Sequence, residues 1–270
     1  MNQAQYNESN TNSQRKFTSL SRIHFLVEFN KEKGKLFLVF TLFLFFALTS
    51  VVTQIVLPEI LDLSGIEIIG LPEPSLMAML SDFWGDTIIY LIIVIFYGMG
   101  TFSSEIEINK PIYFTLSRPV TRKTYFLSRF LIRIIGFFLI FFTASMIIYI
   151  LGSLYFSPLK VERVVLASMI LTLSLTGILS IIIMASSRFR TMTSAVIGFG
   201  FVVYHIFLLL LEKPFEWIKW FDPLLLSNIW FETLNGVANS VEFVVYLIAL
   251  LFWIILPGLI GLLLFENRDI

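Results

Sequence analysis

The sequence contains no cysteine and only two histidines. The absence of cysteine excludes disulfides, thiol nucleophiles, iron–sulfur clusters and zinc sites built on cysteine. Charged residues are also scarce, at 14% of the chain, against about 25% in an ordinary soluble domain. So few charges cannot cover a water-facing surface, which argues against a soluble domain. The 57% hydrophobic content and the 29 phenylalanines exclude a disordered chain.

Long apolar runs take the place of the missing charges. Six of them are long enough to cross the roughly 30 Å hydrocarbon core of a bilayer as helices. Lipid offers no partner for backbone N–H and C=O groups, so each spanning segment must be helical. The sequence therefore predicts an all-α membrane protein with six transmembrane helices. The expected spans are about 36–57, 86–103, 132–154, 164–185, 193–211 and 241–264.

The basic residues are divided unequally between the two ends of these spans. With the N-terminus placed in the cytoplasm, 15 of the 19 lysines and arginines fall in inner segments. The other four are Lys160, Arg163, Lys213 and Lys219. Because cytoplasmic loops are enriched in lysine and arginine, this division predicts that both termini are cytoplasmic, in a multi-pass protein of the plasma membrane. The formal net charge of zero indicates no nucleic-acid partner.

The segment before the first span has two parts. Residues 1–16 are polar and predict a disordered tail, so that residues 17–270 form a single membrane domain. Phe17 to Lys35 is a candidate interfacial helix, because apolar side chains recur at helical spacing. They are Phe17, Leu20, Ile23 and Val27. The alternative is a helix that simply extends the first span.

Two outer loops are longer than a connection requires. Loop Pro58–Gly85 contains an apolar pattern of i, i+3, i+4 and i+7, and loop Glu212–Ser240 contains three tryptophans. Both predict short helices at the outer interface, where tryptophan concentrates. The residues concerned are Leu76, Met79, Leu80 and Phe83 in the first loop and Trp217, Trp220 and Trp230 in the second.

Charged side chains are absent from the centres of the predicted spans. This argues against an ion-coupled carrier, because such carriers use carboxylates near the midplane. Glu105, Arg133 and Glu242 lie at span ends, and snorkelling to water is the expected arrangement for Arg133 and Glu242. His205, near the outer end of the fifth span, is either a proton or ligand contact or a neutral imidazole bonded to a neighbouring carbonyl. Gln54 has the same two interpretations.

Sequence motifs for catalysis are missing as well. There is no HExxH pattern, and Gly34-Lys35 lacks the glycine spacing and the Ser or Thr of a nucleotide-binding P-loop. The chain is therefore predicted not to be an enzyme and to hold no cofactor. If it moves a solute, the energy comes from elsewhere.

The inner loop Gly100–Phe130 is the most informative segment. The second span is predicted to continue as a helix to about Asn109, before Pro111 ends it. Ile112–Ser117 then forms a short aromatic-rich helix, and Thr121 is the predicted N-cap of the helix that becomes the third span. An apolar knob rimmed with charge is typical of a docking element. The alternative is a basic loop resting on anionic lipid.

Two stretches of this loop carry a family resemblance. They read Ser104-Glu105-Ile106-Glu107 and Leu116-Ser117-Arg118-Pro119-Val120-Thr121-Arg122. They resemble the type-2 (export-class) ABC transporter permeases, which carry a Glu near the inner end of the second span, a short coupling helix, and a Leu-Ser/Ala-x-Pro-Val-Ser/Thr-Arg stretch. The usual Gly-Thr after the Glu is replaced here by Asn109-Lys110-Pro111. The six spans, the basic entry and the long last outer loop also match.

The resemblance implies a half-transporter. Two copies, or one copy and a paralogue, would form the membrane pathway above two ABC ATP-binding subunits that hold ATP and Mg. It implies ATPase coupling through Glu105, Glu107, Ile108, Ile112, Tyr113, Phe114, Leu116, Arg118 and Arg122. In this family the first, second and fifth spans usually line the pathway, which makes Gln54, Tyr90, Tyr97 and His205 candidate substrate contacts. A packing role is the alternative for each.

Two other functions compete with this one. The first is an ion-coupled carrier or channel that acts alone, and the second is a membrane scaffold or assembly protein that moves nothing. Small residues, which allow close helix approach, mark candidate dimer contacts, with packing inside one subunit as the alternative. They are Gly98, Gly100, Ala195, Gly198, Gly200, Gly258 and Gly261.

Overall fold

A computed structural model describes residues 3–64, 75–85, 87–104, 121–212 and 215–267, without the side chains of residues 3–23 and 62–64. Within these ranges the chain is helical and contains no strand. The first elements are α1 (Gln3–Val51), the π-helical turn η1 (Val52–Val56), α2 (Leu57–Ser64), α3 (Leu76–Gly85) and α4 (Thr87–Met99). They are followed by α6 (Arg122–Ser153), α7 (Val161–Arg188), α8 (Thr191–Glu212), η3 (Glu216–Phe221), α9 (Pro223–Ser227), α10 (Ile229–Asn235) and α11 (Ser240–Glu266).

Five helical segments of the described chain are long and apolar enough to cross a membrane: His24–Leu61, α6, α7, α8 and α11. The pair α3 and α4, bent by 45° at its break, supplies a sixth if it forms one span. With 13 residues, α4 is only about 20 Å long and cannot cross the hydrocarbon core by itself. The predicted second span, 86–103, is therefore long enough only if α3 and α4 form one bent span.

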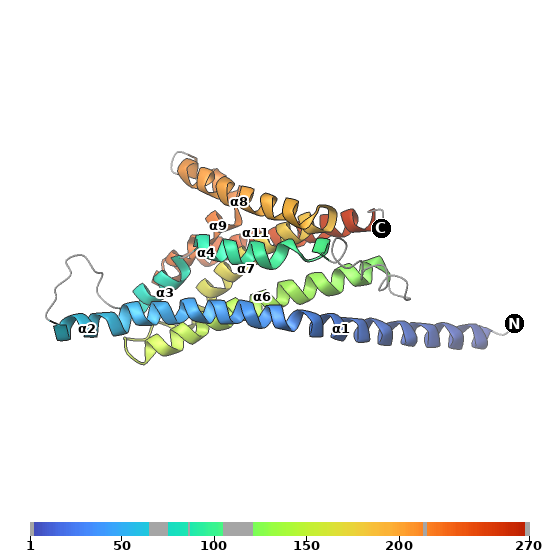
Figure 1. Cartoon of the computed structure of the whole chain (residues 1–270), viewed down its shortest axis with the longest axis horizontal. Helices are drawn as coiled ribbons and strands as arrows, with labels where there is room; N and C mark the ends of the chain where they lie inside the picture. The colour runs from blue at the N-terminus through green and yellow to red at the C-terminus, as the bar shows by residue number, and fades with distance from the viewer. Residues whose placement is uncertain (1–2, 65–74, 86, 105–120, 213–214, 268–270) are drawn as a thin grey trace.

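The long helices alternate in direction (Figure 1). α1, α6 and α8 run one way, and α4, α7 and α11 run the other. The N-terminal half of α1, the end of α4, the start of α6 and the end of α11 consequently lie at the same end of the bundle, on the right in Figure 1. α7 is the central helix, buried along most of its length, whereas α1, α8 and α11 leave most of their apolar surface uncovered.

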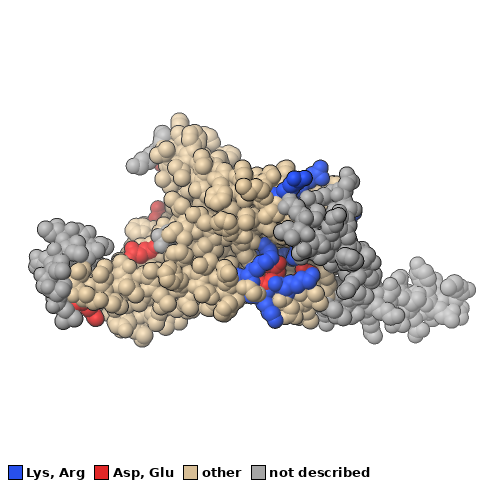
Figure 2. Space-filling view, viewed as in Figure 1, with Lys and Arg blue, Asp and Glu red and all other residues tan. Residues whose placement is uncertain are grey.

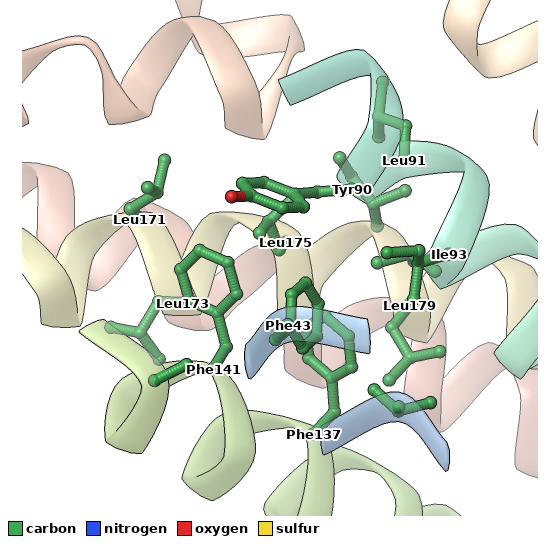
Figure 3. Close-up of a cluster of buried hydrophobic side chains, with 14 of the residues drawn as sticks. Phe43, Tyr90, Leu91, Ile93, Phe137, Phe141, Leu171, Leu173, Leu175 and Leu179 are labelled. Carbon is green, nitrogen blue, oxygen red and sulfur yellow. The ribbon is translucent and has the colours of Figure 1, made fainter. Parts of the chain in front are cut away.

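Aromatic rings fill the core beside α7 (Figure 3). Phe43 of α1 lies 5.0 Å from Phe141 and 5.6 Å from Phe137 of α6, measured between ring centroids. Tyr90 of α4 lies 5.3 Å from both Phe43 and Phe141. These four pairs meet edge to face, the arrangement that the aromatic quadrupole favours. The rings thus fix α1, α4 and α6 to one another in the middle of the bundle.

α1 is a single helix through the segment expected to lie at the interface. The backbone therefore shows the alternative, a helix that extends the first span. Val27 of the expected stripe is 46% exposed, and the face of α1 that is buried in the bundle runs instead through His24, Glu28 and Glu32. The predicted disorder of residues 1–16 stays a prediction, since none of their side chains is described.

The short helices predicted in the outer loops are present. The four apolar residues of the first pattern are all buried in α3, so this helix packs inside the bundle rather than lying on the interface. In the second loop, Trp217 and Trp220 of η3 are exposed, as expected for interfacial tryptophans. Trp230 of α10 packs instead against Trp84 of α3, at a centroid distance of 5.1 Å.

Most of the candidate dimer glycines have neighbours within the chain. A Cβ at Gly98 would lie 2.9 Å from Ile182 of α7, and one at Gly198 would lie 2.8 Å from Ile95 of α4. Gly258 and Gly261 face α6 and α7 in the same way. Close approach of helices inside one subunit therefore accounts for these four. Gly200, by contrast, has no described atom within 4 Å of such a Cβ.

Candidate functional site

A polar site lies at the C-terminal end of α4, where the helix ends in a tight turn. The backbone N–H of Thr101 donates to the carbonyl of Gly98 at 3.1 Å, and its hydroxyl donates to the same carbonyl at 2.6 Å. This tight turn deprives the Tyr97 carbonyl of its usual helical donor, the N–H four residues later. The prediction that the helix continues to about Asn109 is therefore wrong at residues 100–102, and the residues from 105 onward lie outside the description.

Two arginines of α6 fill the space at this helix end. Arg133 donates through Nη1 to the Tyr97 carbonyl and, at 2.8 Å, to the Thr101 hydroxyl. Arg129, one turn earlier, donates through Nη1 to the Thr101 carbonyl at 2.7 Å. Carbonyls at a helix C-terminus carry partial negative charge, so cations are favoured there. The guanidinium groups thus cap α4.

Two glutamates of α1 complete the cluster, and they too are one turn apart. Glu32 accepts from Nη2 of Arg133 at 3.0 and 2.9 Å, one bond to each carboxylate oxygen. Glu28 accepts from Nε of Arg129 at 2.9 Å. We call Glu28, Glu32, Thr101, Arg129 and Arg133 the ion network. It joins three spans that are far apart in the sequence.

The charged side chains of the ion network are almost completely buried, with at most 3% of any one exposed. The snorkelling arrangement expected for Arg133 is therefore wrong, because its charge is satisfied inside the protein by Glu32. Removing one partner from a buried pair typically costs 3–5 kcal/mol. Figure 2 shows acidic and basic side chains gathered at one place over α1, on a described surface that is otherwise largely uncharged.

Lys31 and Lys35 extend the ion network to the surface of α1. Lys31 pairs with Glu28 at 2.8 Å and Lys35 with Glu32 at 3.4 Å, and about half of each lysine side chain is exposed. Among the described residues, four cations therefore surround two carboxylates. The surplus positive charge of these described residues lies on the exposed lysines.

Three buried polar atoms in or beside the ion network have no hydrogen-bond partner among the described residues. They are Nε2 of His24, the hydroxyl of Tyr97 and Nε of Arg133. The ring of Tyr97 is nevertheless engaged, because the guanidinium carbon of Arg133 lies 5.0 Å from its centroid. Such a cation–π contact stabilises the arginine where water is excluded.

Both ends of the inner loop are bonded to other spans. On the entry side, the hydroxyls of Ser103 and Thr191 are 2.9 Å apart, which joins the end of α4 to the start of α8. On the exit side, Arg122 donates to the carbonyl of Glu266 at 3.0 Å, which joins α6 to the end of α11. Thr121 caps α6 by accepting from the N–H of Thr124 at 3.2 Å, so the predicted N-cap is confirmed.

Most of the predicted coupling residues lie outside the described part of the chain. They are Glu105, Glu107, Ile108, Ile112, Tyr113, Phe114, Leu116 and Arg118. Arg122 is the one that the structure describes, and its bond to the end of α11 gives it a partner within the chain. The coupling roles of all nine stay predictions.

The four candidate pathway residues have separate surroundings. Tyr90 is fully buried among aromatic rings, and its hydroxyl donates to the carbonyl of Phe83. Gln54, in η1, donates to Asp82 of α3 at 2.5 Å. Tyr97 lies beside the ion network. These contacts match the packing alternative, and no shared site of the four is formed in the described residues.

His205 pairs with a carboxylate rather than with a carbonyl. Its Nδ1 lies 2.6 Å from Oδ2 of Asp222, and both residues are buried. Asp222 also caps α9, because its other oxygen accepts from the N–H of Leu224 at 2.8 Å. The pair holds the start of α9 against α8. Glu242, expected at the outer start of the sixth span, is exposed in the first turn of α11.

Sequence reasoning missed the ion network, although a signal for it was present. His24, Glu28 and Glu32 recur every four residues and continue into the buried Leu36 of the first span. Arg129 and Arg133 have the same spacing before the third span. Residues four apart share a helix face, so two acids and two bases formed complementary stripes at the inner ends of two helices.

Two of the hollows on the described surface lie beside α1 and α11. One lies between α1 and α4, has a volume of about 400 Å³ and is lined by Lys35, Leu38, Val39, Leu42, Ile92, Ile93, Phe96 and Tyr97. The other, of about 590 Å³, lies between η3 and the start of α11 and contains Lys219 and Tyr246. A side-chain hydrogen bond with Tyr246 raises the pKa of Lys219. The described residues contain no cluster of three or more metal-ligating side chains.

No protein-family model matches this chain, and no curated protein matches it. The membrane character is given by the long apolar helices, and the function has to be inferred from the geometry and the sequence pattern.

Proposed function

We propose that this chain is the membrane permease subunit of an ATP-driven ABC exporter. The main support for this proposal is that both ends of the inner loop are hydrogen-bonded to other spans. Its entry is bonded to α1 and α6 through the ion network and to α8 through Ser103, and its exit is bonded to α11 through Arg122. A force applied to residues 105–120 would therefore reach four spans besides α4.

Rigid attachment of this kind supports mechanical coupling. Domain motions are transmitted by packed elements that move as bodies, and a loop with loose ends would absorb a displacement. Thr101 bonds to both Arg129 and Arg133, so the end of α4 and the start of α6 are held as one body. The chain would need no energy source of its own, because ATP and Mg would be held by two copies of a separate ATP-binding subunit.

In this proposal the end of the bundle with the ion network faces the cytoplasm, and both termini lie on that side of the plasma membrane. The support is the excess of lysine and arginine in the segments at this end. The alternation of helix direction in Figure 1 brings both ends of the described chain to that same side. A second copy or a paralogue would complete the pathway.

The test is co-expression of the full chain with an ABC ATP-binding subunit, followed by purification through a tag on the permease. We expect Tyr113→Asp to weaken the association about thirtyfold or more, because charge at an aromatic hot spot costs at least ~2 kcal/mol. Tyr155→Asp is the matched control, since Tyr155 is exposed after the opposite end of α6. Equal recovery and equal ATPase activity in Tyr113→Asp and the wild type would contradict the docking role.

Two further results would favour the competing functions. Gradient-driven flux through the purified chain in liposomes without ATP would indicate an ion-coupled carrier or channel. Binding of the ATPase with no change in its hydrolysis rate, and no transport, would indicate a scaffold. A permease is expected to alter the rate and to move substrate only with ATP.

A further inference from the structure

The hollow between α1 and α4 has the features of a binding groove for a single lipid chain. Its walls are almost wholly apolar, formed by Leu38, Val39 and Leu42 on one side and by Ile92, Ile93 and Phe96 on the other. Leu38 is 59% exposed and Phe96 is 58% exposed, although the groove between them is closed at its floor by buried residues. Burial of such surface by an acyl chain is favourable.

One end of the groove is polar. Lys35 lies at this end on α1, and seven residues later Leu42 marks the other end, about 10 Å away along the helix. Because α4 runs antiparallel to α1, Tyr97 lies at the Lys35 end and Ile92 at the far end (Figure 1). The groove therefore has the polarity of an amphiphile, with a head position and a tail position.

The positive charge at the head position favours an anionic ligand. Arg129 and Arg133 already balance the carboxylates of Glu28 and Glu32, so Lys31 and Lys35 carry the surplus positive charge. Both lysines are about half exposed, and their long side chains can reach a head group at the bilayer surface. A basic residue near an anionic lipid surface contributes about 1 kcal/mol.

An unsatisfied group lies at the same end. Tyr97 is 5% exposed, and its hydroxyl has no partner among the described residues. A buried hydroxyl without a hydrogen bond costs free energy, so an acceptor supplied by a ligand would be favourable there. The phosphate and ester oxygens of a phospholipid are such acceptors.

We propose that this groove binds one anionic phospholipid of the surrounding bilayer, with an acyl chain between α1 and α4 and its phosphate group at Lys35. Tyr97 donates to an oxygen of the head group or glycerol ester. The site does not depend on ATP-driven transport. It joins a lipid to the helices that hold the ion network.

The experiment is native mass spectrometry of the full chain, purified in detergent and incubated with equimolar phosphatidylglycerol and phosphatidylcholine of identical acyl chains. We expect the wild type to retain one phosphatidylglycerol with about fivefold preference, which corresponds to one lysine contact. Lys35→Gln should abolish the preference. Lys33→Gln, the same change on an exposed lysine outside the groove, should leave it intact. Leu38→Trp should remove retention of both lipids.

Folding of each variant is checked by its melting temperature, and the two lysine variants are the decisive pair because their side chains are exposed. Equal retention of both lipids by the wild type, or equal loss in Lys33→Gln and Lys35→Gln, would overturn the proposal.

A second measurement uses the absence of cysteine from the chain. The thiol of Leu38→Cys should be protected from N-ethylmaleimide by phosphatidylglycerol, with Phe37→Cys as the unprotected control. Disulfide-linked dimers of Leu38→Cys in phosphatidylglycerol vesicles would show that a second copy covers the groove and would overturn the lipid assignment.

Discussion

At one end of the bundle, four buried charges and a threonine bond α1, α4 and α6 together, and their partners are about 30 to 100 residues apart in the sequence. At the other end of α8, His205 contacts Asp222 at the start of α9, which lies 17 residues further along the chain. Thr191, at the first end, and His205 belong to the same helix, about 21 Å apart along its axis. The first arrangement fixes spans to one another, whereas the second fixes a local connection.

The contrast between the ion-network end and the His205 end indicates which parts of the molecule can move separately. Displacing α4 from α1 or α6 at the network end would expose charges to lipid, which is costly. Displacing η3 and α9 from α8 would break the contact of His205 with Asp222 and the hydrogen bond from Tyr204 to the carbonyl of Phe221. We therefore expect the network end to respond as a unit and the His205 end to be the more easily rearranged.

The largest effect is expected from Arg133→Met. The variant leaves Glu32 buried without its closest partner, and we expect the free energy of unfolding to fall by about 3–5 kcal/mol. The measurement is chemical unfolding of the purified chain in detergent. The double variant Glu32→Gln, Arg133→Met removes both charges and should recover most of the loss. An Arg133→Met protein as stable as the wild type would show that the pair does not hold the spans.

A smaller effect is expected at the other end. Asp222→Ala removes the partner of His205 and the cap of α9, and we expect a loss of about 1–3 kcal/mol. Asp222→Asn keeps an oxygen that can accept from Leu224 and should lie between Asp222→Ala and the wild type. The same unfolding measurement serves for both. A loss larger than that of Arg133→Met would reverse the comparison.

The smallest effect is expected at the edge of the ion network. Lys31→Gln removes a pair whose lysine is 45% exposed, and such pairs contribute no more than about 1 kcal/mol. The loss should shrink further as salt is added, because exposed charges are screened. Unfolding at low and high ionic strength provides the check. A loss that is large and insensitive to salt would mean that Lys31 belongs to the buried part of the network.

The sequence predicted the elements whose signals are local. Apolar runs indicated the spans, Thr121 indicated the start of α6, and the apolar spacing from Leu76 to Phe83 indicated α3. The predictions that failed concern features that depend on contacts with distant parts of the chain. Hydropathy could not show that the helix in the second predicted span ends at Met99 after only 13 residues, because the chain stays apolar around this end.

The candidate site was missed for the same reason. Glu28 and Arg129 are about 100 residues apart, and each alone resembles a solvated charge beside a span. Only their packing shows that the face of α1 buried in the bundle begins with acids. The local break of α4 was equally hidden, since it depends on hydroxyl bonds of Thr101 that compete with helical ones.

The turn at Thr101 has a consequence for how the inner loop and the spans influence each other. If α4 were to lengthen by a turn into the loop, the N–H of Thr101 would bond to the Tyr97 carbonyl, and Arg133 would lose that acceptor. Helix growth at this point would also move the carbonyl and the hydroxyl of Thr101, which accept from Arg129 and Arg133, so it competes with the hold of the arginines on α4. A binding event at the loop that moves Thr101 would therefore change how tightly the arginines hold α4, and a change in the arginine contacts would affect that binding by the same free energy.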